Sequence, residues 1–94
     1  MKKEKFIVKA SDIFNVPADV KGGLLHTEIE GSRAVFFENH KGIISLGEDE
    51  IEINSGEGRV LVSGQRLSVA AMNSEEIRIV GKIEKVEFHG RGAE

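Results

Sequence analysis

The sequence predicts an all-β fold, a small single-domain sheet of about six to eight short, mostly antiparallel strands. Three observations support this prediction. Apolar residues make up 39% of the 94-residue chain, and most are Val, Ile and Leu, of which the β-branched types favour strands. Eleven glycines against a single proline indicate many tight turns. From residue 24 onward, apolar and polar residues alternate with a period of two, which is typical of strands that bury one face.

Eight candidate strands follow one another along the chain. Turn-forming residues, mainly Gly and Asn, separate most of them. Strands at such close spacing predict a sandwich, a roll or a short solenoid-like stack. The expected strands cover residues 24–30, 34–38, 42–46, 50–53, 59–63, 66–71, 76–80 and 82–88.

The alternation also assigns side chains to faces. In Ile51-Glu52-Ile53 the two isoleucines share one face of the strand, and the glutamate faces water. Val60-Leu61-Val62 breaks this pattern. We therefore expect that strand to be covered on both faces and to lie at the centre of the core.

Three glycines, Gly47, Gly64 and Gly81, recur at intervals of seventeen residues. Each lies between two apolar strands, so stacked two-strand units would explain the interval. Coincidence in a glycine-rich chain is the alternative explanation. Under either explanation these glycines separate strands, because only glycine adopts a positive φ without a steric penalty.

The chain divides into an N-terminal arm (residues 1–16), a β domain (17–89) and a C-terminal tail (90–94). Residues 5–10 have the pattern of an edge strand, and Ser11 has the position of a helix cap. Pro17 ends this segment. We expect the order of the arm to depend on a partner.

Charge and composition narrow the function classes and the compartment. Residues 1–9 carry a net charge of +3, and since the whole chain carries −3, the remainder carries −6. An acidic body repels phosphate backbones, so we expect no nucleic-acid partner. No apolar run approaches the ~20 residues of a membrane-spanning helix, which argues against direct membrane insertion. A chain without cysteine and without a signal-peptide pattern is expected to be cytoplasmic.

Few residues suggest catalytic or metal chemistry. His26, His40 and His89 lack the spacing of metal ligands, and no cysteine accompanies them. Glu48-Asp49-Glu50 lacks the regular spacing of a calcium loop. We therefore expect no catalytic residues, no metal, no cofactor and no enzymatic activity. The alternative is a small ligand- or cation-binding regulatory module centred on the acidic triplet and the His40 turn.

Five residues form the predicted interaction site: Phe36, Phe37, Asn39, His40 and Lys41. Adjacent residues of a strand point to opposite faces, so one phenylalanine should enter the core. The other should be covered by the arm or form an interface. His40 lies in a turn whose Asn and Gly supply unusual backbone angles, either as a turn residue or as a partner contact.

In order and spacing, these segments resemble the YabP/YqfC family of bacterial sporulation proteins, and its YqfC-like members in particular. The resemblance covers about residues 16–88. Its opening is Val16-Pro17-Ala18-Asp19-Val20, and its most recognisable run is Glu38-Asn39-His40-Lys41-Gly42-Ile43. The glycine-punctuated apolar segments at residues 58–64 and 76–88 follow in register.

The resemblance implies a non-enzymatic structural or assembly protein of the mother cell in a spore-forming bacterium. It also implies protein–protein contacts with a membrane-linked sporulation protein, which would place the chain at the periphery of a membrane. Exposed strand edges add a homo-oligomer to the expected partners, because an unpaired edge is a template for another chain.

Overall fold

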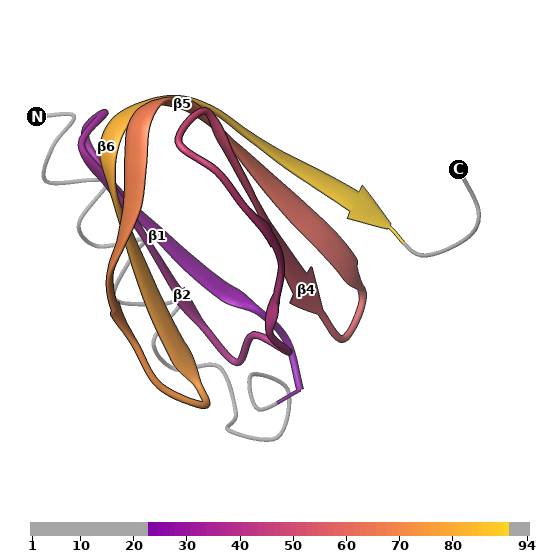
Figure 1. The fold of residues 1–94 in the computed structure, drawn as a ribbon. Helices are drawn as coiled ribbons and strands as arrows, with labels where there is room; N and C mark the ends of the chain where they lie inside the picture. Colours follow the sequence, from indigo (N-terminus) through magenta and orange to yellow (C-terminus); the bar gives the residue numbers. More distant parts are fainter. Residues whose placement is uncertain (1–22, 91–94) are drawn as a thin grey trace, which may run out of the picture.

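Six β-strands form one antiparallel sheet in the computed structural model, which describes residues 23–90 (Figure 1). This architecture confirms the all-β prediction. The predicted arm and most of the predicted tail lie outside the described residues. Within residues 23–90, no helix is long and apolar enough to cross a membrane. The strands are β1 (His26–Glu30), β2 (Ala34–Glu38), β3 (Ile43–Leu46), β4 (Glu50–Ser55), β5 (Gly58–Met72) and β6 (Glu76–Gly90), in the spatial order β1-β2-β6-β5-β4-β3.

β5 and β6 each combine two of the predicted strands. The sequence predicted breaks at Gly64 and Gly81, but the chain bends at these glycines and stays in the sheet. Residues 58–63 of β5 pair with β4, whereas residues 76–80 of β6 pair with β2. The bend thus divides the sheet into a first half, with β1 and β2, and a second half, with β3 and β4 (Figure 1).

Close backbone approach explains the glycines at the bend. A Cβ atom on Gly64 would overlap the carbonyl oxygen of Lys82. Gly81 has a φ of 140°, and a Cβ there would lie 2.6 Å from the carbonyl oxygen of Arg66. Gly47, the first glycine of the seventeen-residue interval, lies in the β3–β4 turn. The interval therefore reflects two equivalent bends and one turn.

Two turns close over the bend through backbone hydrogen bonds. The amide of Leu67 donates to the carbonyl of Glu48 in the β3–β4 turn, at 2.8 Å. The amide of Ile83 donates to the carbonyl of Ser32 in the β1–β2 turn, also at 2.8 Å. These bonds satisfy backbone groups that the irregular register at the bend leaves out of the ladder.

The core lies between the two halves of the sheet. Val60 and Val62 are fully buried there, as the sequence predicted. Leu61 between them is only half-buried on the outer face, so the expectation that this strand is covered on both faces is wrong. The core cluster consists of Val35, Phe37, Ile51, Ile53, Val60, Val62, Leu67, Ile77, Ile79 and Ile83.

Candidate functional site

Phe36 and Phe37 lie on opposite faces of β2, as predicted. Phe37 has 0% exposed surface and packs in the core. A partner cannot touch it while the sheet is folded, so it leaves the set of candidate contact residues. Phe36 is half-buried on the outer face of the first half. It is the phenylalanine that remains available for an interface.

Charged residues of both signs surround Phe36. Glu28 of β1 and Arg78 of β6 lie directly opposite it in the ladder. The Nη2 atom of Arg78 lies 2.7 Å from the Oε1 atom of Glu30, and the Nε2 atom of His26 lies 2.9 Å from the Oε2 atom of Glu28. We call the surface formed by these five residues the Phe36 face; they are Phe36, His26, Glu28, Glu30 and Arg78. Facing side chains are close enough to pack, so the aliphatic parts of Glu28 and Arg78 can flank the ring.

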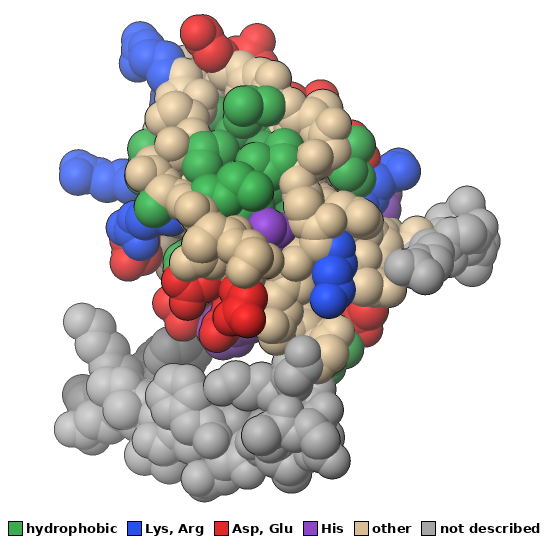
Figure 2. All heavy atoms as spheres, turned by 60° about the horizontal axis from the view of Figure 1, so that its bottom comes forward, with side chains coloured by type: hydrophobic (Ala, Val, Ile, Leu, Met, Phe, Trp, Pro, Cys, Tyr) green, Lys and Arg blue, Asp and Glu red, His purple; other side chains and the backbone are tan. Residues whose placement is uncertain are grey.

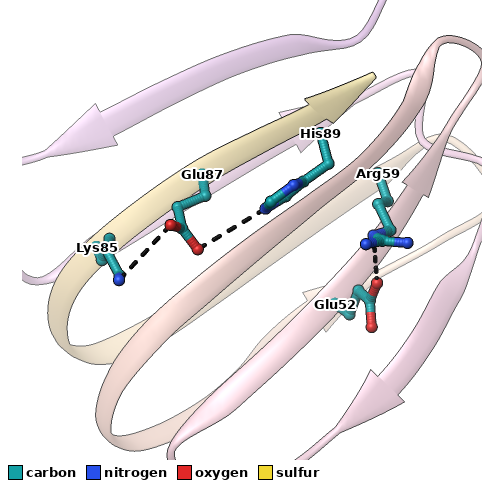
Figure 3. Close-up of polar contacts among 5 residues, drawn as sticks. All are labelled: Glu52, Arg59, Lys85, Glu87 and His89. Atoms are coloured by element: carbon teal, nitrogen blue, oxygen red, sulfur yellow. Dashed lines mark ion pairs between the residues drawn. The ribbon is translucent and has the colours of Figure 1, made fainter. Parts of the chain in front are cut away.

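The outer face of the second half carries a second group of charges (Figure 3). Arg59 of β5 places its Nε atom 2.9 Å from the Oε2 atom of Glu52 in β4. On β6, Glu87 lies between Lys85 at 3.6 Å and His89 at 3.8 Å. All three pairs are partly exposed to solvent, so each contributes ~1 kcal/mol or less to stability.

Leu61 lies at the centre of this second group, in register with Glu52 on one side and Glu87 on the other. We call Leu61 and its charged neighbours the Leu61 face. It has the same plan as the Phe36 face: one apolar side chain between charged residues on adjacent strands. The sequence did not indicate this face, because the run Val60-Leu61-Val62 suggested a strand covered on both sides. The charged residues that lie opposite Leu61 are distant in sequence.

The predicted His40 turn connects the two halves of the sheet. The His40 side chain is buried, with 5% of its surface exposed. Its Nδ1 atom accepts a hydrogen bond from the backbone N–H of Gly42 at 2.8 Å. Its Nε2 atom is then the donor to the carbonyl oxygen of Asn73, at 2.9 Å. Both ring nitrogens are therefore used inside the protein.

Residues 39–42, which we call the clamp, contact three further parts of the chain. Asn39 adopts a φ of 71° and donates from Nδ2 to the carbonyl of Leu24 at 3.0 Å. The backbone N–H of Asn39 donates to Glu75 at 2.7 Å, and that of Lys41 donates to Asn54 at 2.8 Å. Asn39 and His40 thus hold the fold, while Lys41 is exposed. That this site contacts a partner stays a prediction.

The acidic triplet and His40 do not meet. Glu48 lies at the bend, where its carbonyl oxygen accepts a hydrogen bond from the amide of Leu67. The His40 side chain is hydrogen-bonded to Asn73, which directly follows the end of β5. β3 lies between them. Within residues 23–90, no three His, Asp or Glu side chains are grouped so that they could hold a metal ion. The structure does not assemble the two features into one ligand site.

A shallow cleft lies where the β4–β5 turn meets the end of β6. Leu25, Val60, Phe88, Arg59 and His89 are among the residues that line it, and its volume is about 130 Å³. Pockets that enclose small-molecule ligands usually measure ~300–1,000 Å³. This cleft can hold a side chain of another protein more readily than a cofactor.

Comparison with known proteins bears out the sequence resemblance. The model of the YabP family matches residues 25–94, which include all six strands. The chain is 29% identical over 73 residues to a protein of Bacillus subtilis (strain 168) named "Uncharacterized protein YqfC", and the match covers 78% of each chain. No solved structure matches this chain.

Proposed function

Because the chain belongs to the YabP family, we propose that it is a non-enzymatic structural or assembly protein of sporulation, acting through protein–protein contacts in the mother cell. Its partners under this proposal are a second copy of the chain, a membrane-linked sporulation protein, or both. The motif carried by residues 38–43 supports the sporulation role by resemblance. The structure supports the mode of action through the Phe36 face.

Phe36 is the observation that carries the contact proposal. A half-buried aromatic side chain on an open sheet face gains further burial when another molecule covers it. Its charged neighbours include both signs, as at the polar rim of many interfaces. Burial of Phe36 would supply affinity, and the Arg78–Glu30 ion pair and the His26–Glu28 hydrogen bond would help to select the partner.

The charged residues of both outer faces support a non-enzymatic protein. Arg59 pairs with Glu52, and Glu87 lies between Lys85 and His89 (Figure 3). These side chains are spread over an open sheet surface and pair with one another. Catalytic acids and bases, in contrast, usually converge on one concave site.

A single substitution on the outer face tests the contact proposal. We expect Phe36→Asp to weaken the complex of the full chain with itself or its partner by ~30-fold or more, since a central aromatic contact contributes at least ~2 kcal/mol. Light scattering coupled to gel filtration over a wide concentration range measures self-association. Isothermal titration measures binding of a purified sporulation partner.

Leu61→Asp is the matched control, because it places the same charge at the same kind of position on the other outer face. It should leave the complex intact. Phe37→Asp would not serve, because a carboxylate in the core would unfold the chain. If Phe36→Asp and Leu61→Asp bind equally well, the Phe36 face is not the contact surface.

The sporulation role is tested separately in the spore-forming host. Deletion of the gene should lower the number of heat-resistant spores, and the wild-type chain should restore it. Phe36→Asp should fail to restore the count, while Leu61→Asp should succeed. A normal spore count after deletion contradicts the proposed role, whatever the result of the binding measurements.

A further inference from the structure

Two strand edges face each other without pairing in the described part of the chain. β3 pairs with β4 on one side only, and residues 68–72 of β5 pair only with β6. At both ends of these edges, hydrogen bonds connect the segments next to β3 with β5 or with the turn that follows it. The His40 side chain bonds to Asn73 at one end, and the amide of Leu67 bonds to Glu48 at the other. We call the space between these two edges the seam.

Apolar side chains of the inner faces reach the surface at the seam. Leu46 lies in register with buried Ile51, and Met72 with buried Ile77, so both belong to the face that forms the core. Yet Leu46 is 64% exposed and Met72 is 51% exposed. Figure 2 shows a continuous area of hydrophobic side chains framed by backbone. The sandwiched core is therefore open at this side.

An added strand would satisfy both features of the seam. No residue of 23–90 pairs in a ladder with the outer edge of β3 or with the edge of residues 68–72 that faces away from β6. An extended segment between them can form main-chain hydrogen bonds and place alternate side chains over Leu46 and Met72. Proteins usually cover such edges, because an exposed apolar edge promotes aggregation.

The charged residues at the two ends of the seam indicate which kind of strand can bind there. At one end of the seam, Glu48 and Asp49 lie in the β3–β4 turn and Glu50 begins β4, and the turn at the other end carries Glu75. The cations of the same turns and bend are Lys41, Arg66 and Lys82, so acidic residues outnumber them. A second copy that docked through its own seam would bring like charges together. A strand with apolar centre and lysines at both ends fits better.

We propose that residues 5–10 of this chain occupy the seam as an added strand. Their sequence, Lys5-Phe6-Ile7-Val8-Lys9-Ala10, has a lysine on each side of three apolar residues. Six residues match the extent of residues 67–72. In an extended strand Phe6 and Val8 share one face, which lies over Leu46 and Met72. The proposal does not rest on the proposed function.

The connection to the domain is long enough. Leu24 is held at the clamp through Asn39, and the clamp adjoins the His40 end of the seam. The twelve residues from 11 to 22 can span up to ~40 Å, whereas a six-residue strand is ~20 Å long. The segment can therefore reach either end of the seam within one molecule.

Disulfide trapping tests the proposal, because the chain has no cysteine of its own. The test variant of the full chain combines Val8→Cys with Leu46→Cys, and a second variant combines Val8→Cys with Met72→Cys. The control combines Val8→Cys with Arg59→Cys, which lies exposed on the Leu61 face. Circular dichroism verifies that each variant is folded, and all introduced sites on the domain are solvent-exposed.

We expect at least one seam variant to form an intramolecular disulfide about tenfold faster than the control. Docking of the segment raises the local concentration of the two thiols. Moving the cysteine from position 8 to position 7 (Ile7→Cys) should lower the rate of disulfide formation, because adjacent strand residues face opposite ways. Equal rates for both seam variants and the control would overturn the proposal. Disulfide-linked dimers in place of monomers would also overturn it and would assign the seam to a second copy.

Discussion

At the bend, β5 and β6 pass so close to each other that Gly64 has no room for a side chain. At the opposite end, the clamp crosses from β2 to β3 and is held by the side chains of Asn39 and His40. Both ends connect the same two halves of the sheet. One depends on the absence of side-chain atoms, and the other depends on hydrogen bonds that particular side chains make.

This difference predicts different responses to mutation. At the bend, any side chain forces backbone atoms apart, so the identity of the new residue matters little. At the clamp, a substitution removes bonds while the surrounding backbone can stay in place, so its effect depends on which bonds the new residue retains. Three measurements test whether the bend and the clamp differ in this way.

The largest effect is expected for Gly64→Ala. The new Cβ would overlap the carbonyl oxygen of Lys82, and the paired strands would have to separate. We expect a loss of at least ~3 kcal/mol in the free energy of unfolding, or failure to fold. Urea denaturation followed by circular dichroism measures it. The control is Gly23→Ala, because an added Cβ there would meet no atom within 4 Å apart from those of its chain neighbours, and it should change stability by no more than ~0.5 kcal/mol. Equal stabilities would show that the bend is not sterically restricted.

An intermediate effect is expected for His40→Ala. The change leaves the Asn73 carbonyl and the Gly42 amide without their side-chain partner. Such a loss costs ~1–3 kcal/mol, measured by the same denaturation. Lys41→Ala is the neighbouring control, since its side chain is exposed and only its backbone serves the clamp. A His40→Ala variant as stable as Lys41→Ala would mean that the clamp does not depend on the imidazole.

The smallest effect is expected for Asn39→Gly, which loses the bond to Leu24 but tolerates the φ of 71°. We expect a cost of ~1 kcal/mol for the lost bond. Asn39→Ala should cost a further ~1–2 kcal/mol, because a Cβ disfavours the left-handed conformation. The difference between the two variants measures the backbone contribution at the clamp. If glycine and alanine cost the same, that contribution is absent.

Much of the sheet was predictable from local pattern. The alternation placed Ile51, Ile53, Ile77 and Ile79 on buried faces, and the structure buries all four. The opposite placement of Phe36 and Phe37 followed from strand geometry alone. Which of the two enters the core was not predictable, because it depends on how β2 pairs with β6.

The strand count and the candidate faces needed the folded chain. Gly64 and Gly81 were expected to end strands, but local sequence does not distinguish a break from a bend inside a ladder. Leu61 was assigned to a doubly covered strand because Glu52 and Glu87 are far from it in sequence. Cross-strand register, which decides these neighbours, is a non-local property.

The amino-acid sequence was sufficient to predict an all-β protein, because apolar and polar residues alternate along short segments, glycines lie in most connections and the motif of the family is present. These features are local, because each depends on a few adjacent residues and their preferred backbone angles. The folded arrangement was needed to show that His40 is a buried link, that Phe37 belongs to the core and that Leu46 and Met72 border an open seam. Those outcomes depend on which strands meet when the sheet bends, and burial is determined by the partners that the bend brings together.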